Sequence, residues 1–333
     1  MAVRYSETEY AFVSAKVRSL ESGLVSRAQL ERMLASENSD DAFAVLRENG
    51  FSQKGRVTAA SCEDTLLAAL KAGLDAVKSG LPHPGVVKVF EYPYDCNNIK
   101  AAIKCGFRGI DPSPMLFDTG SVSAATVADA CAKRDFSALP ENMAKAAEEA
   151  IYAFKKTGNP QSIDFILDRA CFLDIAACAK EYRIPFITKY CAASADLTDF
   201  MICLRVLRMR CGAYGETLVP AALVDGGSIG REDFLKAFRS GEDALFALIG
   251  KKYPYITDNC RPGCDLEVAE RTCDNCRLRF SETGKKVTMG IEVPVSYILA
   301  LENEIKNVRI ILAGKDAGLS EDRIRERLRD CYV

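Results

Sequence analysis

Apolar residues recur at helical spacing through most of the chain, and this pattern constrains the fold more than any other feature. Near the start, five apolar residues fall on one stripe at spacings of about three and four: Phe12, Val13, Val17, Leu20 and Leu24. The alternating pattern that marks half-buried strands is nearly absent. We therefore predict an all-α protein, either a helix bundle or a helical repeat array.

The expected helix boundaries follow from local signals. Ser26 and Ser39 are predicted N-caps of helices over 27–36 and 40–48, and Gly50 lies just past the second of these. Further helices are predicted over 62–78, 122–133, 141–156 and 162–182. Pro- and Gly-rich turns separate the helical runs at 81–85, 111–114, 157–160 and 225–228.

Three long amphipathic segments resemble one another. Each has an acid, Asp95, Asp196 or Glu304, followed three residues later by Asn or Asp and then by an apolar residue. The acids are 101 and 108 residues apart, and we expect the first two to begin long helices and the third to lie within one. Predicted core stripes accompany them at Ile99, Ile103, Gly106 and Phe107, at Leu197, Phe200, Met201 and Leu204, and at Leu301, Ile305, Val308 and Leu312. Threefold repetition and chance similarity between amphipathic helices both explain this pattern.

Charge and hydropathy restrict the functional classes. The 333-residue chain has a net charge of -2, which argues against a nucleic-acid binder with a strongly basic domain. No apolar run approaches the roughly 18 residues that a membrane-spanning helix needs. The first nine residues are too charged for the apolar core of a signal peptide. We expect a cytosolic protein that reaches a membrane only through a partner.

The sequence contains 14 cysteines, which we expect to be mostly free thiols. Cys171, Cys178 and Cys203 occupy apolar helical positions, where a free thiol packs as a small hydrophobe.

One cysteine set has an alternative interpretation. Cys260, Cys264, Cys273 and Cys276 are spaced in a way that resembles a four-thiolate zinc site. Against zinc, Cys273 and Cys276 share helical spacing with Leu266 and Ala269, and the central gap is shorter than in common zinc patterns. We predict no metal site, and stoichiometric zinc in the purified protein would overturn that prediction.

Catalytic candidates are few. The only histidine is His83, in a turn-like segment, so a Ser-His-Asp or Cys-His site would have to use it. The segment around Gly284 fails as a phosphate-binding loop, because Arg279 and Lys286 stand where Gly and Ser or Thr are required. We predict no catalytic residue, no cofactor and no bound nucleotide.

Basic residues recur on the three similar segments. They are Lys100, Lys104 and Arg108 on the first, Arg205, Arg208 and Arg210 on the second, and Lys306 and Arg309 on the third. Solvated helix faces explain this pattern. A positive lining that receives an acidic partner explains it as well. These eight residues are our candidate partner interface.

Four ordered blocks of the chain resemble the C subunit of bacterial and archaeal V/A-type ATPases, the relative of the eukaryotic d subunit. They are the opening helix at 10–24, the Asp-x-x-Asn segment at 94–100, the stretch Gly-Ile-Glu-Val-Pro-Val-Ser-Tyr onward at 290–315, and the terminus at 318–333. The resemblance extends over nearly the whole chain, and the blocks follow one another in the expected order. Asp199 departs from the pattern, because Asn stands at the matching place of the first segment.

The resemblance implies a funnel-shaped, all-helical molecule of three similar domains around a pseudo-threefold axis, which we place at 1–110 (with the N-terminal helix), 111–213 and 214–333. It implies a non-catalytic central-stalk component, peripheral on the cytoplasmic face of the membrane. Its partners would be the D and F subunits of the stalk and the membrane rotor ring. Its task would be to couple ion transport to ATP hydrolysis or synthesis on the catalytic A and B subunits. The component that the resemblance implies would not span the membrane itself.

Two alternatives remain open from the residues. A general helical scaffold that binds peptides or protein partners would share the same composition and helical pattern. An enzyme built on the Cys260–Cys276 segment would depend on thiols or zinc. A pull-down that recovers D, F or ring subunits would favour the ATPase component over the general scaffold. Metal content and cysteine-to-serine variants test the second.

Overall fold

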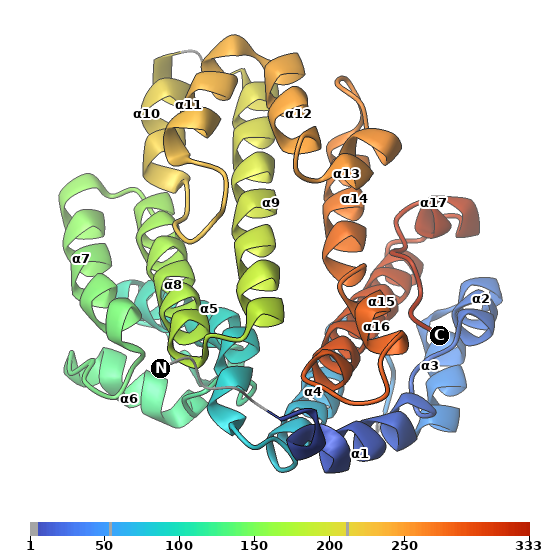
Figure 1. The fold of residues 1–333 in the computed structure, drawn as a ribbon. Coiled ribbons are helices and arrows are strands. Elements are labelled where there is room, and N and C mark those ends of the chain that lie inside the picture. The colour runs from blue at the N-terminus through green and yellow to red at the C-terminus, as the bar shows by residue number, and fades with distance from the viewer. Residues whose placement is uncertain (1–5, 53–54, 211–212) are drawn as a thin grey trace. The chain divides into compact units, whose positions relative to one another are not determined.

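The computed structural model describes residues 6–52, 55–210 and 213–333, and this part of the chain is helical without a strand (Figure 1). The prediction of an all-α fold is confirmed. None of the helices in these ranges combines the length and the apolar character that a bilayer crossing requires. Residues 1–5, which belong to the segment used to argue against a signal peptide, lie outside the described ranges.

The described residues form two compact units. One extends from Gly85 to Leu266, and the other joins the N-terminal segment up to Pro84 to Glu267–Val333. The second unit is therefore built from both ends of the sequence. The predicted division at 110 and 213 concerns sequence repeats rather than compactness, and it stays a prediction.

The unit built from both ends is organised around one long helix, α16 (Glu292–Asp316), which packs against α1, α2, α3, α4, α15 and α17. Of its 25 residues, 17 are buried, so α16 is enclosed on nearly all sides, as expected for a central helix. The surrounding elements are η1 (Glu7–Tyr10), α1 (Ala11–Glu21), α2 (Arg27–Ala35), α3 (Ser39–Leu46), η2 (Arg47–Asn49), α4 (Glu63–Lys78), α14 (Leu266–Leu278), α15 (Ser281–Lys285) and α17 (Glu321–Arg325).

The other unit contains two long helices that each carry a repeated acid. Helix α5 (Lys88–Arg108) packs against α6, α7 and α8, whereas α9 (Pro185–Met209) packs against α8, α10, α11 and α12. The remaining elements are η3 (Pro84–Val87), η4 (Ser113–Met115), α6 (Ala124–Lys133), α7 (Glu141–Thr157), α8 (Gln161–Tyr182), α10 (Ala213–Ala222), α11 (Arg231–Ser240), α12 (Glu242–Gly250) and α13 (Pro254–Asn259).

Most local predictions are confirmed. The Ser26 hydroxyl accepts the Gln29 N–H at 3.3 Å and caps α2, and Gly50 adopts the left-handed conformation at a φ of 85°. The predicted helices agree with the observed ones to within a few residues. All four predicted turns lie where the α-helices end, and the first two overlap the short helices η3 and η4. One cap is corrected: Asn38, not Ser39, caps α3 by accepting the Asp41 N–H at 3.0 Å. Asn serves as well as Ser in this role, so two adjacent candidates could not be separated by type.

Two further expectations are wrong. Phe12 is 68% exposed, because Val13 and Val17 face the core and Phe12 is turned about 100° from Val13 around the helix. Asp95 and Asp196 also do not begin their helices. Helix α5 begins at Lys88, and α9 begins at Pro185, whose fixed φ favours the first helical position.

The predicted core stripes are buried except at one end. All four stripe residues on α9 and all four on α16 are buried, as are Ile99 and Ile103 on α5. Gly106 is exposed and Phe107 is half-buried. The apolar stripe of α5 is therefore incompletely covered at its C-terminal end.

Candidate functional site

The repeated acid of α9 holds a distant loop in place. Asp196 is fully buried, and its Oδ1 accepts the backbone N–H groups of Ser228 at 2.8 Å and Ile229 at 2.9 Å. Its Oδ2 accepts the Ser228 hydroxyl and the Tyr253 hydroxyl, the latter at 2.7 Å. A Cβ at Gly227 would collide with the same carboxylate, so only glycine permits this approach. The loop and one tyrosine thus supply the hydrogen bonds that a buried charge requires.

The repeated acid of α5 makes the same arrangement. Asp95 Oδ2 accepts the Ser121 N–H at 3.1 Å and the Ser121 hydroxyl at 2.6 Å, and Oδ1 accepts the Val122 N–H at 3.0 Å. Gly120 likewise leaves no room for a Cβ beside this carboxylate. The Gly-Ser-Val loop at 120–122 therefore occupies the place that Gly-Ser-Ile occupies at 227–229.

The position three residues after each acid also binds a backbone group. Asn98 accepts the Phe117 N–H at 3.1 Å and donates its amide to the Phe117 carbonyl at 2.7 Å. Asn307 makes the same pair with Arg329, at 2.8 Å and 3.2 Å.

At the same position on α9, Asp199 accepts the Val224 N–H at 2.8 Å but has no amide to donate. Burial raises the pKa of Asp199 to about 7, while the Val224 hydrogen bond acts in the opposite direction.

The third acid differs from the other two. Glu304 is 6% exposed on α16 and accepts a backbone hydrogen bond from Val25, but its Oε2 has no hydrogen-bond partner in the part of the chain that the structure describes. Burial raises its pKa to about 7, and the Val25 bond opposes that shift. Glu304 thus accepts one backbone bond, from the connection between α1 and α2, whereas each of the two aspartates accepts two backbone N–H groups and a serine hydroxyl.

The raised pKa of Glu304 predicts that the free energy of unfolding depends on pH. Its folded-state pKa is raised, so the folded protein retains a proton that the unfolded chain releases, and stability falls as pH rises from about 4.5 to about 7. Glu304→Gln removes this titration. We expect the free energy of unfolding of Glu304→Gln, relative to the parent, to rise by about 1–3 kcal/mol between pH 4 and pH 8. Denaturant titrations at both pH values measure this difference, and a pH-independent difference contradicts it.

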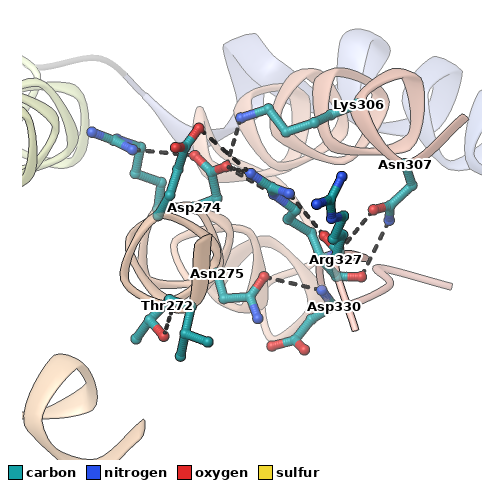
Figure 2. A network of polar contacts seen from close by, with 11 residues as sticks. Thr272, Asp274, Asn275, Lys306, Asn307, Arg327 and Asp330 are labelled. Carbon is teal, nitrogen blue, oxygen red and sulfur yellow. Dashed lines mark hydrogen bonds and ion pairs between the residues drawn. The ribbon is translucent and has the colours of Figure 1, made fainter. Parts of the chain in front are cut away.

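Asn307 of α16 belongs to a wider polar network that joins α14, α16 and the C-terminal segment (Figure 2). Asp274 accepts Lys306 Nζ at 2.9 Å and Arg329 Nε at 2.9 Å, and the Asp330 N–H donates to Asn275 Oδ1 at 3.0 Å. Burial opposes ionisation of Asp274, but the surrounding cations, with Lys306 foremost, lower its pKa overall. The C-terminal segment is therefore held by charged and neutral hydrogen bonds at once.

Most of the basic candidates are engaged within their own unit. Ion pairs join Lys100 with Asp168, Lys104 with Asp164, Arg208 with Glu242, Lys306 with Asp274 and Arg309 with Glu63. Arg108, Arg205 and Arg210 are exposed, so a partner can reach their side chains.

The thirteen cysteines in the described ranges are free thiols, and Cys171, Cys178 and Cys203 are buried as predicted. Cys260 and Cys264 belong to one compact unit, and Cys273 and Cys276 to the other. Burial raises the pKa of Cys273 to about 12, which opposes the thiolate form that binds metal. Within the described residues, no three His, Cys, Asp or Glu side chains are grouped to hold an ion.

Comparison with known proteins gives one consistent family. The family model described as "ATP synthase (C/AC39) subunit" matches residues 13–327. The C subunit of the V-type sodium ATPase of Enterococcus hirae is 23% identical over 337 residues, covering 97% of this chain and 99% of the relative.

Two archaeal relatives are C subunits of A-type ATP synthases. That of Thermococcus onnurineus is 24% identical, over 97% of this chain and 91% of its own length. That of Haloquadratum walsbyi is 34% identical over 125 residues, 35% of this chain and 36% of the relative. The family is that of a structural, non-catalytic component of a rotary ATPase. Because the match extends over nearly the whole chain, the chain belongs to the C/AC39 subunit family of ATP synthases.

Proposed function

We propose that this chain is the socket of a rotary V/A-type ATPase, joining the central shaft of D and F subunits to the membrane rotor ring. It transmits torque between ion flow and ATP turnover and carries no active site. The chain lies on the cytoplasmic face of the membrane, where it is attached through the rotor ring. The observation that carries the proposal is the family match over residues 13–327, together with relatives aligned almost end to end.

The enclosed long helices support a mechanical role. Helix α16 buries 17 of its 25 residues, and α9 buries 12 of its 25. Close-packed interiors are hardly compressible, so such helices pass on strain instead of absorbing it. The loop that Asp196 holds and the loop that Asp95 holds add fixed tertiary links within their unit.

We also propose that the three acid-bearing helices are copies of one ancestral repeat, with domains at 1–110, 111–213 and 214–333. Matched contacts support this: two Gly-Ser loops are bound by equivalent aspartates, and Asn98 and Asn307 make the same paired backbone bonds. Helices that resemble one another only through amphipathic spacing would have no reason to share such contacts.

Binding to the other components tests the proposed function. Purified D–F complex and purified rotor ring are each titrated onto the immobilised chain, and we expect saturable binding of both. A general helical scaffold, the alternative function, predicts that neither binds while unrelated helical peptides do. Absence of D–F and ring binding, with the chain folded by circular dichroism, refutes the socket.

Charge reversal tests the basic surface. Arg205 is exposed on α9, so Arg205→Glu should leave folding intact and weaken D–F binding about 5- to 10-fold at low salt, with a smaller effect at about 0.5 M salt, where charges are screened. Lys145→Glu is the matched control, because Lys145 is an exposed α7 cation that pairs with Glu141 of the same helix. Equal affinities for both variants at low salt would exclude Arg205 from the interface.

A further inference from the structure

The incompletely covered end of α5 opens into a groove lined mainly by apolar side chains. The groove has a volume of about 230 Å³ and lies among α5, α6 and α7. Its walls are Ala102, Ile103, Gly106 and Phe107 of α5, Cys131 and Ala132 of α6, Ile151 of α7, and Arg134 directly after α6. A space of this size accommodates one or two aliphatic side chains. Seven of the eight lining residues are apolar, as in sites that receive a side chain from a partner.

The floor of the groove is preformed. Phe107 packs against Phe154 of α7 with ring centroids 4.3 Å apart, and this contact joins the C-terminal turns of α5 and α7. Burial raises the pKa of the Cys131 thiol to about 11, so this side chain is neutral at physiological pH and acts as a hydrophobe. A partner would therefore enter an existing pocket without prior rearrangement of these helices.

Cations stand where the helices bordering the groove end. Arg134 lines the groove itself, Arg108 directly follows Phe107, and Lys155 directly follows Phe154. All three are exposed, and none forms an ion pair within the described part of the chain. A hollow lined mainly by apolar side chains, with the unpaired cation Arg134 in its wall, is complementary to an apolar side chain flanked by carboxylates.

We propose that this groove binds an acidic amphipathic helix of another component of the same ATPase, with one or two aliphatic side chains in the hollow and Asp or Glu side chains toward Arg134 and Arg108. The helix-in-groove mode uses anchors at spacings of three and four, with charged residues beside them. That the partner is an ATPase component rests on the proposed function, whereas the groove itself does not.

The test uses a fluorescent 18-residue peptide with Leu along one helical stripe and Glu at the remaining positions, titrated with the full chain. We expect saturable binding that weakens with salt, and no binding when Lys replaces Glu in the peptide. Ala132→Trp fills the groove and Arg134→Glu reverses its charge, and each should weaken binding at least about 10-fold.

Arg183→Glu is the matched control. Arg183 ends α8 in the same left-handed conformation as Arg134 ends α6, with φ values of 52° and 56°, and it is exposed. The affinity of this variant should stay within about 2-fold of the parent. Peptide binding that is absent, or that Ala132→Trp and Arg134→Glu leave unchanged, refutes the groove.

A displacement arm then identifies the class of partner. Purified components of the ATPase are added singly to the complex of chain and peptide, and at least one should release the peptide from the parent chain. If none does, the occupant is not an ATPase component and that part of the proposal is wrong. D–F and ring binding are measured separately, so a failure of the proposed function is seen independently of the peptide result.

Discussion

Asp199→Asn is expected to stabilise the protein by roughly 2–4 kcal/mol at pH 8 and by much less at pH 4. Asp199 is 4% exposed, and burial holds its pKa at about 7, above its ordinary value of 3.8. The folded state therefore keeps a proton that the unfolded chain loses. Stability falls as pH rises from about 3.8 to about 7, by at most about 1.4 kcal/mol per pH unit.

Asparagine removes this titration and adds a donor. Asn98 and Asn307, at the matching positions of the other two helices, accept a backbone N–H and donate to the carbonyl of the same residue. Asn at 199 can accept the Val224 N–H as Asp199 does and donate to the Val224 carbonyl, so no new unsatisfied group is created.

Denaturant unfolding at pH 4 and pH 8 measures the effect, and Asn98→Asp is the reciprocal control. That variant introduces a carboxylate at an equally buried position, so it should destabilise the protein at pH 8 and much less at pH 4. If Asp199→Asn leaves the stability at pH 8 unchanged, Asp199 is not held protonated by burial.

The fold class could be predicted from the sequence because helix signals are local. Apolar spacing, the Ser26 cap and the Gly50 terminator each act within one or two turns, and the structure confirms them. Errors arose where two local signals were nearly equal, as with Asn38 and Ser39. The apolar stripe predicted near the start included Phe12 as well as Val13 and Val17, but the buried face of the helix does not extend to Phe12.

The sites were only partly predictable, because their partners are distant in sequence. The acids at 95 and 196 stood out, but the Gly-Ser-Val and Gly-Ser-Ile loops that they bind begin 25 and 31 residues later, and nothing in the sequence of those segments links them to the acids. Likewise, the sequence shows Lys100 and Lys104 at helical spacing, yet only tertiary packing reveals that Asp168 and Asp164 of α8 neutralise them.

Asp196→Ala is expected to cost about 3–5 kcal/mol of stability, the largest effect predicted for a single substitution here. It removes the acceptor for two backbone N–H groups and two hydroxyls at once, in a fully buried place where water cannot replace it. Circular dichroism melting and denaturant titration of the parent and the variant give the loss.

Two controls isolate the buried carboxylate. Asp225→Ala lies in the same turn region but removes an ion pair with half-exposed Arg169, so it should cost less than about 1 kcal/mol. Asp196→Asn keeps an oxygen for the Ser228 and Ile229 N–H groups, so it should cost clearly less than Asp196→Ala. Equal losses for Asp196→Ala and Asp225→Ala would mean that the 227–229 loop is held by its own turn and not by α9. The repeated segments would then resemble one another in sequence without sharing the role of holding a loop.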